Sequence, residues 1–145
     1  TGNFPNLTAS VRIDFGGRDS ASDLAIQSDG RIVLVGTTEA KGGNAFAVAR
    51  LSAGGLLDST FGTGGRVTTS FVDGDTGSGG DRAHAVALQN DGRIVVAGQA
   101  EMHANIDRND FALARYNSNG SLDTSFSGDG KVTTDFGLAT NASDT

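Results

Sequence analysis

Acidic side chains gather in one stretch of this sequence, and carboxylates are the groups that bind calcium. Asp73, Asp75 and Asp81 lie within VDGDTGSGGD, where Gly74 and Gly77 permit tight turns. The stretch resembles an oxygen-rich calcium loop, although it lacks the terminal Glu of an EF-hand and the flanking helices. Two interpretations follow: a calcium site, or an acidic loop that is simply solvated.

The two histidines, His84 and His103, are the next candidates for chemistry. With Glu101 or Asp107 they could form a metal site or an acid–base pair, because imidazole titrates near neutral pH and binds metals. The alternative is that both histidines are bystanders on long loops.

Nucleophilic and phosphate chemistry find no support. The chain has no cysteine and no Gly-x-Ser-x-Gly motif. The GSGGD string that begins at Gly77 lacks the lysine and the helix of a phosphate-binding loop. The net charge of −6 repels phosphate backbones, which argues against nucleic acid as a partner. No apolar run approaches the ~20 residues that a membrane helix needs.

An internal repeat must position these candidate residues. FAVARLSAGGLLDSTFGTGGRV (46–67) and FALARYNSNGSLDTSFSGDGKV (111–132) are identical at 10 of 22 positions and lie 65 residues apart. SDGRIVLVG at Ser28 and NDGRIVVAG at Asn90 form a second pair, 62 residues apart. Both pairs are typical of a tandem array of one supersecondary unit.

Short strands fit every part of the repeat. Residues 11–15, 67–71 and 132–136 alternate apolar and polar side chains, which is the period of a half-buried strand (strand A). Three further strands are expected in each repeat: B at 23–27 and 85–89, C at 31–38 and 93–99, and D at 45–51 and 110–116. The Asp-Gly pair between B and C predicts a type I′ hairpin, in which both residues have positive φ.

The strand C residues are apolar without alternation, which indicates a sheet that is covered on both faces. Four short antiparallel strands covered on both faces describe a propeller blade. Between D and the next A, we expect Asp58 and Asp123 to cap a turn and to pair with Arg50 and Arg115.

Several strings resemble a known family. LDSTFGTGGRVTTSF, NDGRIVVAG, DFALARYNSNGSLDTSF and GDGKVTTDFG are similar to the bacterial delta-60 repeat, a β-propeller repeat found in tandem in secreted and surface proteins. The likeness covers residues 11–137. It implies a propeller scaffold on a secreted or surface protein, and it implies no established catalytic residues. The first repeat departs from the pattern, because its A-to-B loop is short and no LDTSF element precedes it.

The expected fold is all-β, with two four-stranded antiparallel blades and the first strand of a third. Residues 1–10 would be a leader or linker, 11–66 the first blade, 67–131 the second, and 132–145 the first strand of an incomplete third blade with its tail. Closed propellers have about four to eight blades, and two blades alone would expose large apolar faces. We therefore expect copies of the chain to complete the ring, most simply as a homotrimer with six blades. The other interpretation is a fragment of a longer array.

Differences in loop length point to one candidate binding surface. The second repeat has six extra residues in its A-to-B loop and three in its C-to-D loop. In a four-stranded meander both loops leave the sheet at the same end, and loops commonly carry function. That end would hold residues 72–84 and 99–110.

Three functions remain open. The first is a non-enzymatic scaffold that presents loops to a protein or glycan partner and needs no cofactor, unless the acidic loop binds calcium. The second is a glycan-binding lectin, in which Tyr116 at a pocket between blades supplies the aromatic ring that the loops lack. The third is a hydrolase or lyase that uses His84 and His103.

Overall fold

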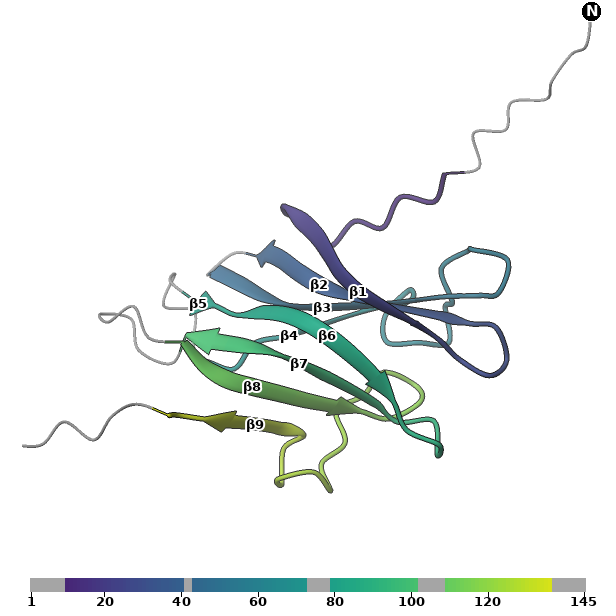
Figure 1. The fold of residues 1–145 in the computed structure, drawn as a ribbon. Helices are drawn as coiled ribbons and strands as arrows, with labels where there is room; N and C mark the ends of the chain where they lie inside the picture. The colour runs from purple at the N-terminus through teal and green to yellow at the C-terminus, as the bar shows by residue number, and fades with distance from the viewer. Residues whose placement is uncertain (1–9, 41–42, 73–78, 102–108, 137–145) are drawn as a thin grey trace, which may run out of the picture.

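The fold consists of two β-sheets that lie against each other (Figure 1). It is seen in a computed structural model, which describes residues 10–40, 43–72, 79–101 and 109–136. The first sheet has the order β1 (Asp19–Ile26), β2 (Ile32–Ala40), β3 (Gly43–Leu51) and β4 (Arg66–Thr69), and the two-residue β5 (Gly79–Gly80) pairs parallel to β3. The second sheet has the order β6 (Arg82–Leu88), β7 (Ile94–Glu101), β8 (Asn109–Tyr116) and β9 (Lys131–Thr134).

The predicted fold class is confirmed. Successive strands pair antiparallel in both four-stranded sheets. All regular elements among the described residues are strands, and none of these residues forms a helix that could cross a membrane.

The A strands end the sheets instead of beginning them. β4 pairs with β3 and β9 pairs with β8, whereas residues 11–15 form no strand. The expected first strand of a third blade is therefore wrong, because residues 131–134 complete the second sheet. The D-to-A connection explains this order: Arg50 N donates to Gly65 O and Asp58 N donates to Arg50 O, both at 2.9 Å, which folds β4 back beside β3.

The sheet limits consequently differ from the repeat limits expected from the sequence. The first sheet extends from Asp19 to Thr69 and the second from Arg82 to Thr134. Each sheet thus combines strands B, C and D of one repeat with strand A of the next.

The B-to-C turns also differ from the expectation. Gly30 has a φ of 87°, but Asp29 is not among the described residues with positive φ. Gly30 N donates to Gln27 O (2.9 Å) and Gln27 N donates to Arg31 O (2.8 Å). The loop therefore has three residues, a type I turn followed by glycine, and the prediction of a type I′ turn was wrong.

The core lies between the two sheets. We call the two faces of each sheet its front face and its back face and define them by the residues that they carry. The front face of the first sheet carries Val33, Val35, Phe46, Val48 and Thr69. The back face of the second sheet carries Val86, Ile94, Val96, Ala112 and Tyr116. These two faces pack on each other, and nearly all of these side chains are buried. In β3, Phe and Val point to the front face and Ala47 and Ala49 to the back face, as the alternation in strand D predicts.

Several hydrogen bonds join the two sheets, and three of them show how the sheets are placed. The hydroxyls of Thr69 and Tyr116 lie 2.7 Å apart. Val86 N donates to Asp23 Oδ2 at 3.0 Å, and Gly62 N donates to Asn119 O at 2.8 Å. The second sheet is therefore seated on the first in one defined register.

Each D-to-A connection is fixed by an arginine and an aspartate, as predicted. Arg50 Nε donates to Asp58 Oδ2 at 2.8 Å, and Arg115 Nε donates to Asp123 Oδ2 at 2.8 Å. The guanidinium of Arg50 also lies 4.6 Å from the ring centre of Phe61, which is a cation–π contact.

The predicted turn caps are present as well. Asp58 Oδ1 accepts hydrogen bonds from Thr60 Oγ1 (2.6 Å) and Thr60 N (3.0 Å), and Asp123 makes the same pair with Ser125. Hydrogen bonds from the Thr60 and Ser125 side chains are the main reason why the pKa values of Asp58 and Asp123 lie below the usual range.

Candidate functional site

Asp81, one of the three candidate calcium ligands, is hydrogen-bonded to backbone groups of two separate segments. Its side chain is fully buried, Oδ2 accepts a hydrogen bond from Phe71 N (2.9 Å), and Oδ1 accepts one from Glu101 N (3.3 Å). Burial raises the pKa of Asp81, while these hydrogen bonds lower it to a smaller extent. The carboxylate thereby connects the segment after β4 to the end of β7.

The other expected calcium ligands, Asp73 and Asp75, lie outside the described residues. Within the described ranges, no group of three or more His, Asp or Glu side chains is arranged to hold a metal ion.

Of the predicted acid–base residues, the structure describes His84 and Glu101. His84 is exposed, and its Nε2 lies 3.3 Å from Gln99 Oε1. Glu101 lies at the end of β7 beside Gly80, where an added Cβ would stand 2.4 Å from Glu101 Oε2. His103 and Asp107 lie outside the described residues. The backbone N–H of Glu101 donates to Asp81 Oδ1, so these two residues lie next to each other.

Tyr116 does not lie in an open pocket. Its ring is fully buried between the sheets, and its hydroxyl is bonded to Thr69. Burial raises the pKa of Tyr116 far above the usual range. The residue therefore serves the core and the register of the sheets.

Connections from both sheets meet at one end of the molecule, which we call the loop end. Gly79 pairs with Gly43, so the chain that enters the second sheet passes beside the start of β3. Asp81 is bonded to the backbone of Glu101, at the end of β7. The predicted binding surface comprised residues 72–84 and 99–110, of which residues 73–78 and 102–108 lie outside the described residues. Its described parts include Gly79–Gly80 and the ends of β6 and β7, which lie at the loop end.

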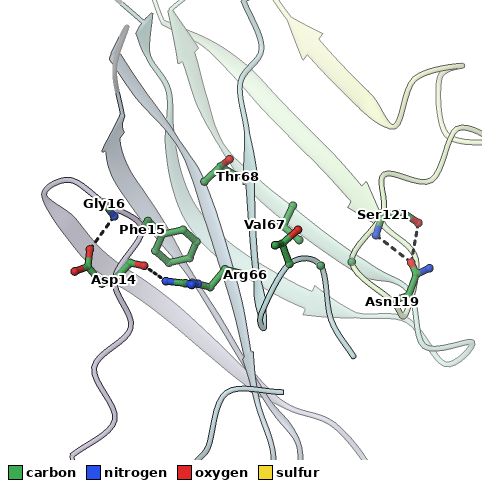
Figure 2. A pocket seen from close by; sticks show the side chains of 11 residues that line it. Asp14, Phe15, Gly16, Arg66, Val67, Thr68, Asn119 and Ser121 are labelled. Atoms are coloured by element: carbon green, nitrogen blue, oxygen red, sulfur yellow. Dashed lines mark hydrogen bonds between the residues drawn. The ribbon is translucent and has the colours of Figure 1, made fainter. Parts of the chain in front are cut away.

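A large cavity lies elsewhere, between the N-terminal segment and the rim of both sheets (Figure 2). It has a volume of about 900 Å³ and is lined by Asp14, Phe15, Arg66 and Thr68, together with the turn at 119–121. The Arg66 guanidinium donates to Asp14 O, and Asp14 Oδ1 accepts from Gly16 N at 2.7 Å. These polar groups are hydrogen-bonded to each other, so the cavity is a gap where the N-terminal segment lies against the sheets, and these groups are not directed at a ligand.

A second hollow, which the sequence analysis missed, lies on the front face of the second sheet. It has a volume of about 360 Å³, and its lining includes His84, Ala97, Phe111, Leu113 and Phe136. The rings of Phe111 and Phe136 meet edge to face with 4.9 Å between their centres. The signal was present in the repeat, because Phe111 corresponds to the buried Phe46.

Comparison with known proteins gives one match. A family model described as "Domain of unknown function (DUF5122) beta-propeller" matches residues 27–61 and 89–126. Both segments begin directly after the B strand and end in the D-to-A connection, so the match reproduces the repeat found in the sequence. No curated protein and no solved structure shows a significant match.

Proposed function

Since the chain belongs to this β-propeller family of unknown function, whose model matches half of its residues, we propose that it is a non-enzymatic scaffold and binding module. In this proposal, the blades join further blades into a ring and present loops to a protein or glycan partner. The resemblance to the delta-60 repeat supports a place on a bacterial secreted or surface protein. Copies of the chain complete the ring, most simply three copies with six blades.

The convergence of connections at the loop end is the observation that carries the proposal. The Gly79–Gly43 pair and the Asp81–Glu101 hydrogen bond fix strand ends from both sheets next to each other. Two neighbouring blades therefore offer one composite surface on a rigid base. Binding residues are commonly found on loops that such a base positions.

The direct test is binding to a glycan array and to candidate protein ligands with a shortened loop. Residues 102–108 are replaced by the AKGG sequence of residues 40–43, which occupies the same connection in the first repeat. The proposal expects this variant to lose binding while it keeps its fold. A matched control is Asn90→Ser, which introduces the first-repeat residue in the turn after β6. Undiminished binding by the shortened variant would refute the role of the loop.

The lectin alternative no longer has Tyr116 as its aromatic ring, because that ring is buried. Its remaining support is the exposed pair of Phe111 and Phe136 beside the Gln99 amide. Loss of array binding in Phe111→Ala, with the shortened loop variant unaffected, would favour a lectin whose site lies on the sheet face.

The enzyme alternative depends on His84 and His103. His84 is exposed, and its Nε2 lies 3.3 Å from the neutral Gln99 amide, which does not activate it as a base. A hydrolase or lyase activity that disappears in both His84→Ala and His103→Ala, with folding intact, would replace the present proposal.

A further inference from the structure

The two sheets are copies of each other, so each buried face has a counterpart of known environment. Residues of β1 and β2 correspond to residues of β6 and β7 at an offset of 62, and those of β3 and β4 to those of β8 and β9 at an offset of 65. The front face of the first sheet is buried by the second sheet. No described segment covers the corresponding front face of the second sheet.

Exposure of the phenylalanines shows this difference most clearly. Phe46 is 0% exposed and its counterpart Phe111 is 67% exposed. Phe71 is 7% exposed and its counterpart Phe136 is 71% exposed. The ring pairs have the same geometry, with centres 4.8 Å apart in the buried pair and 4.9 Å in the exposed pair. The exposed front face of the second sheet therefore has the same arrangement of aromatic side chains as the buried front face of the first sheet.

The back face of the first sheet shows the converse relation. Leu24 and Ile26 are 53% and 65% exposed, while their counterparts Val86 and Leu88 pack against the core between the sheets. Large apolar side chains exposed together on one face are typical of an interaction surface. The molecule thus has one uncovered front face and one incompletely covered back face.

The N-terminal segment indicates what the back face of the first sheet is shaped to receive. Phe15 N donates to Asp19 Oδ2 at 2.9 Å, as Phe71 N donates to Asp81 Oδ2 at 2.9 Å. Arg66 donates to Asp14 O, as its counterpart Lys131 donates to Ser70 O. Residues 14–15 therefore occupy the place that residues 70–71, directly after β4, occupy on the second sheet. That place belongs to the last strand of a preceding blade.

We propose that the front face of the second sheet binds the back face of the first sheet of a second copy, in the register seen between the two sheets of one chain. This inference rests on the proposed function, and it specifies which two faces meet, and in which register, when copies of the chain complete the ring. Because the two faces differ, the contact is head-to-tail and generates a ring or an open filament. The incoming residues 132–136 take the place of residues 11–15, so that Phe136 N donates to Asp19.

The residues that differ between the two contacts leave no amide without a partner. Asp23, which accepts from Val86 N, corresponds to Ala85. The amide that Ala85 would face is Leu24 N, and this amide already donates to Asp23 Oδ1 at 2.9 Å. Tyr116 corresponds to Leu51 and Thr69 to Thr134, so the contact between copies lacks the hydroxyl pair and sets the Thr134 side chain against leucine. The backbone amide at the changed position keeps its partner in the contact between copies.

The test compares the solution mass of the intact chain with that of three single variants. Phe111→Arg places a charge on the front face, and Ile26→Arg places one on the back face. Leu56→Arg is the control, because Leu56 is as exposed as Ile26 (65%) but lies in the D-to-A connection. We expect the wild-type chain and Leu56→Arg to have a multiple of the chain mass, and the two face variants to have the mass of one chain.

A mixing experiment tests the head-to-tail geometry. Phe111→Arg keeps an intact back face, and Ile26→Arg keeps an intact front face. An equimolar mixture should therefore form a species of twice the chain mass and nothing larger. If the mixture remains at the mass of one chain, the head-to-tail contact is wrong.

Circular dichroism and thermal melting verify that each variant is folded. If either face variant is unfolded, Phe136→Arg and Leu24→Arg replace them on the same faces, since both side chains are exposed. A monomeric wild-type chain overturns the inference, as does an unchanged mass in the front-face variants. A monomeric wild-type chain whose glycan binding disappears in Phe111→Arg would assign the face to a glycan. The shortened loop variant separates the two proposals, because it should lose binding without a change in mass.

Discussion

At the scale of single residues, Asp81 is the acceptor on which the contact between strand ends depends. The variant Asp81→Ala leaves the amides of Phe71 and Glu101 without their acceptor. Leaving buried donors unpaired costs about 1–3 kcal/mol, so we expect the free energy of unfolding to fall by roughly that amount. Chemical denaturation measures it. Glu39→Ala is the control, because that carboxylate is exposed and its ion pair with Arg18 is long, at 3.8 Å, and also exposed. A similar loss of stability in both variants would contradict the role of Asp81.

Acid should act through Asp58 and Asp123. Their folded-state pKa values lie below the usual range, so the stability they contribute is complete above the unfolded value of about 3.9 and is lost as the pH falls through the folded value. Asp81 acts with the opposite sign, because its raised pKa favours the protonated form in the folded state. We expect the melting temperature to fall steeply below about pH 4.

The variant Asp123→Asn tests this assignment. It removes one of the two carboxylates with a lowered pKa, so its melting temperature should be lower at neutral pH and should depend less on pH in the acid range. Thermal melts across a pH series measure both effects. An acid dependence identical to that of the wild type would show that Asp123 is not a source of it.

At the scale of elements, two equivalent glycines test how closely the sheets approach. Gly55 and Gly120 end the same turn in the two repeats, with φ of 85° and 90°. An added Cβ at Gly120 would stand 2.9 Å from Gly62 N, whereas one at Gly55 would meet no atom within 4 Å. Both alanine variants carry a similar backbone strain of about 1 kcal/mol.

We therefore expect Gly120→Ala to lower the free energy of unfolding more than Gly55→Ala, since only Gly120 lies against the neighbouring sheet. The comparison is made in a Phe111→Arg background, so that contacts between copies do not contribute. Chemical denaturation gives the difference, and equal losses would contradict the described packing of the second sheet on the first.

Most strands, and the antiparallel pairing of B with C and of C with D, could be predicted from the sequence, but the partner of strand A could not. Alternation in residues 67–71 shows that a strand exists, yet period alone does not say whether it pairs with the preceding or the following strand. The hydrogen bonds of Arg50 with Gly65 and Asp58 decide this, and they involve backbone groups that no side-chain pattern records. Asp-Gly likewise fits both a two-residue and a three-residue turn.

The role of Asp81 could not be recognised from its neighbours in the sequence. Its spacing from Asp73 and Asp75 allowed either a calcium site or a solvated acidic loop. Neither interpretation included the amides of Phe71 and Glu101, which lie 10 and 20 residues away in the sequence. The usable signal was the repeat, since Asp19 corresponds to Asp81 at the offset of 62 and caps Phe15 in the same way. The contribution of Phe111 to an uncovered face could also have been predicted from its correspondence with Phe46.

At the scale of the whole molecule, the proposed assembly would be driven by burial of the exposed apolar faces. Burial of apolar surface contributes about 25 cal/mol per Å², and the side chains that gain most are those whose counterparts are already buried inside the chain. Phe111 and Phe136 on one face, and Leu24 and Ile26 on the other, would all be covered by a single kind of contact. In a head-to-tail assembly, each front face is covered by the back face of another copy, so no third surface is needed.

The solution mass of the wild-type chain, measured by sedimentation equilibrium, tests this claim most directly. A head-to-tail ring gives a multiple of the chain mass, three for a ring of six blades, and the Phe111→Arg variant should have the mass of one chain. A wild-type chain that remains folded and has the mass of one chain at every concentration would contradict it.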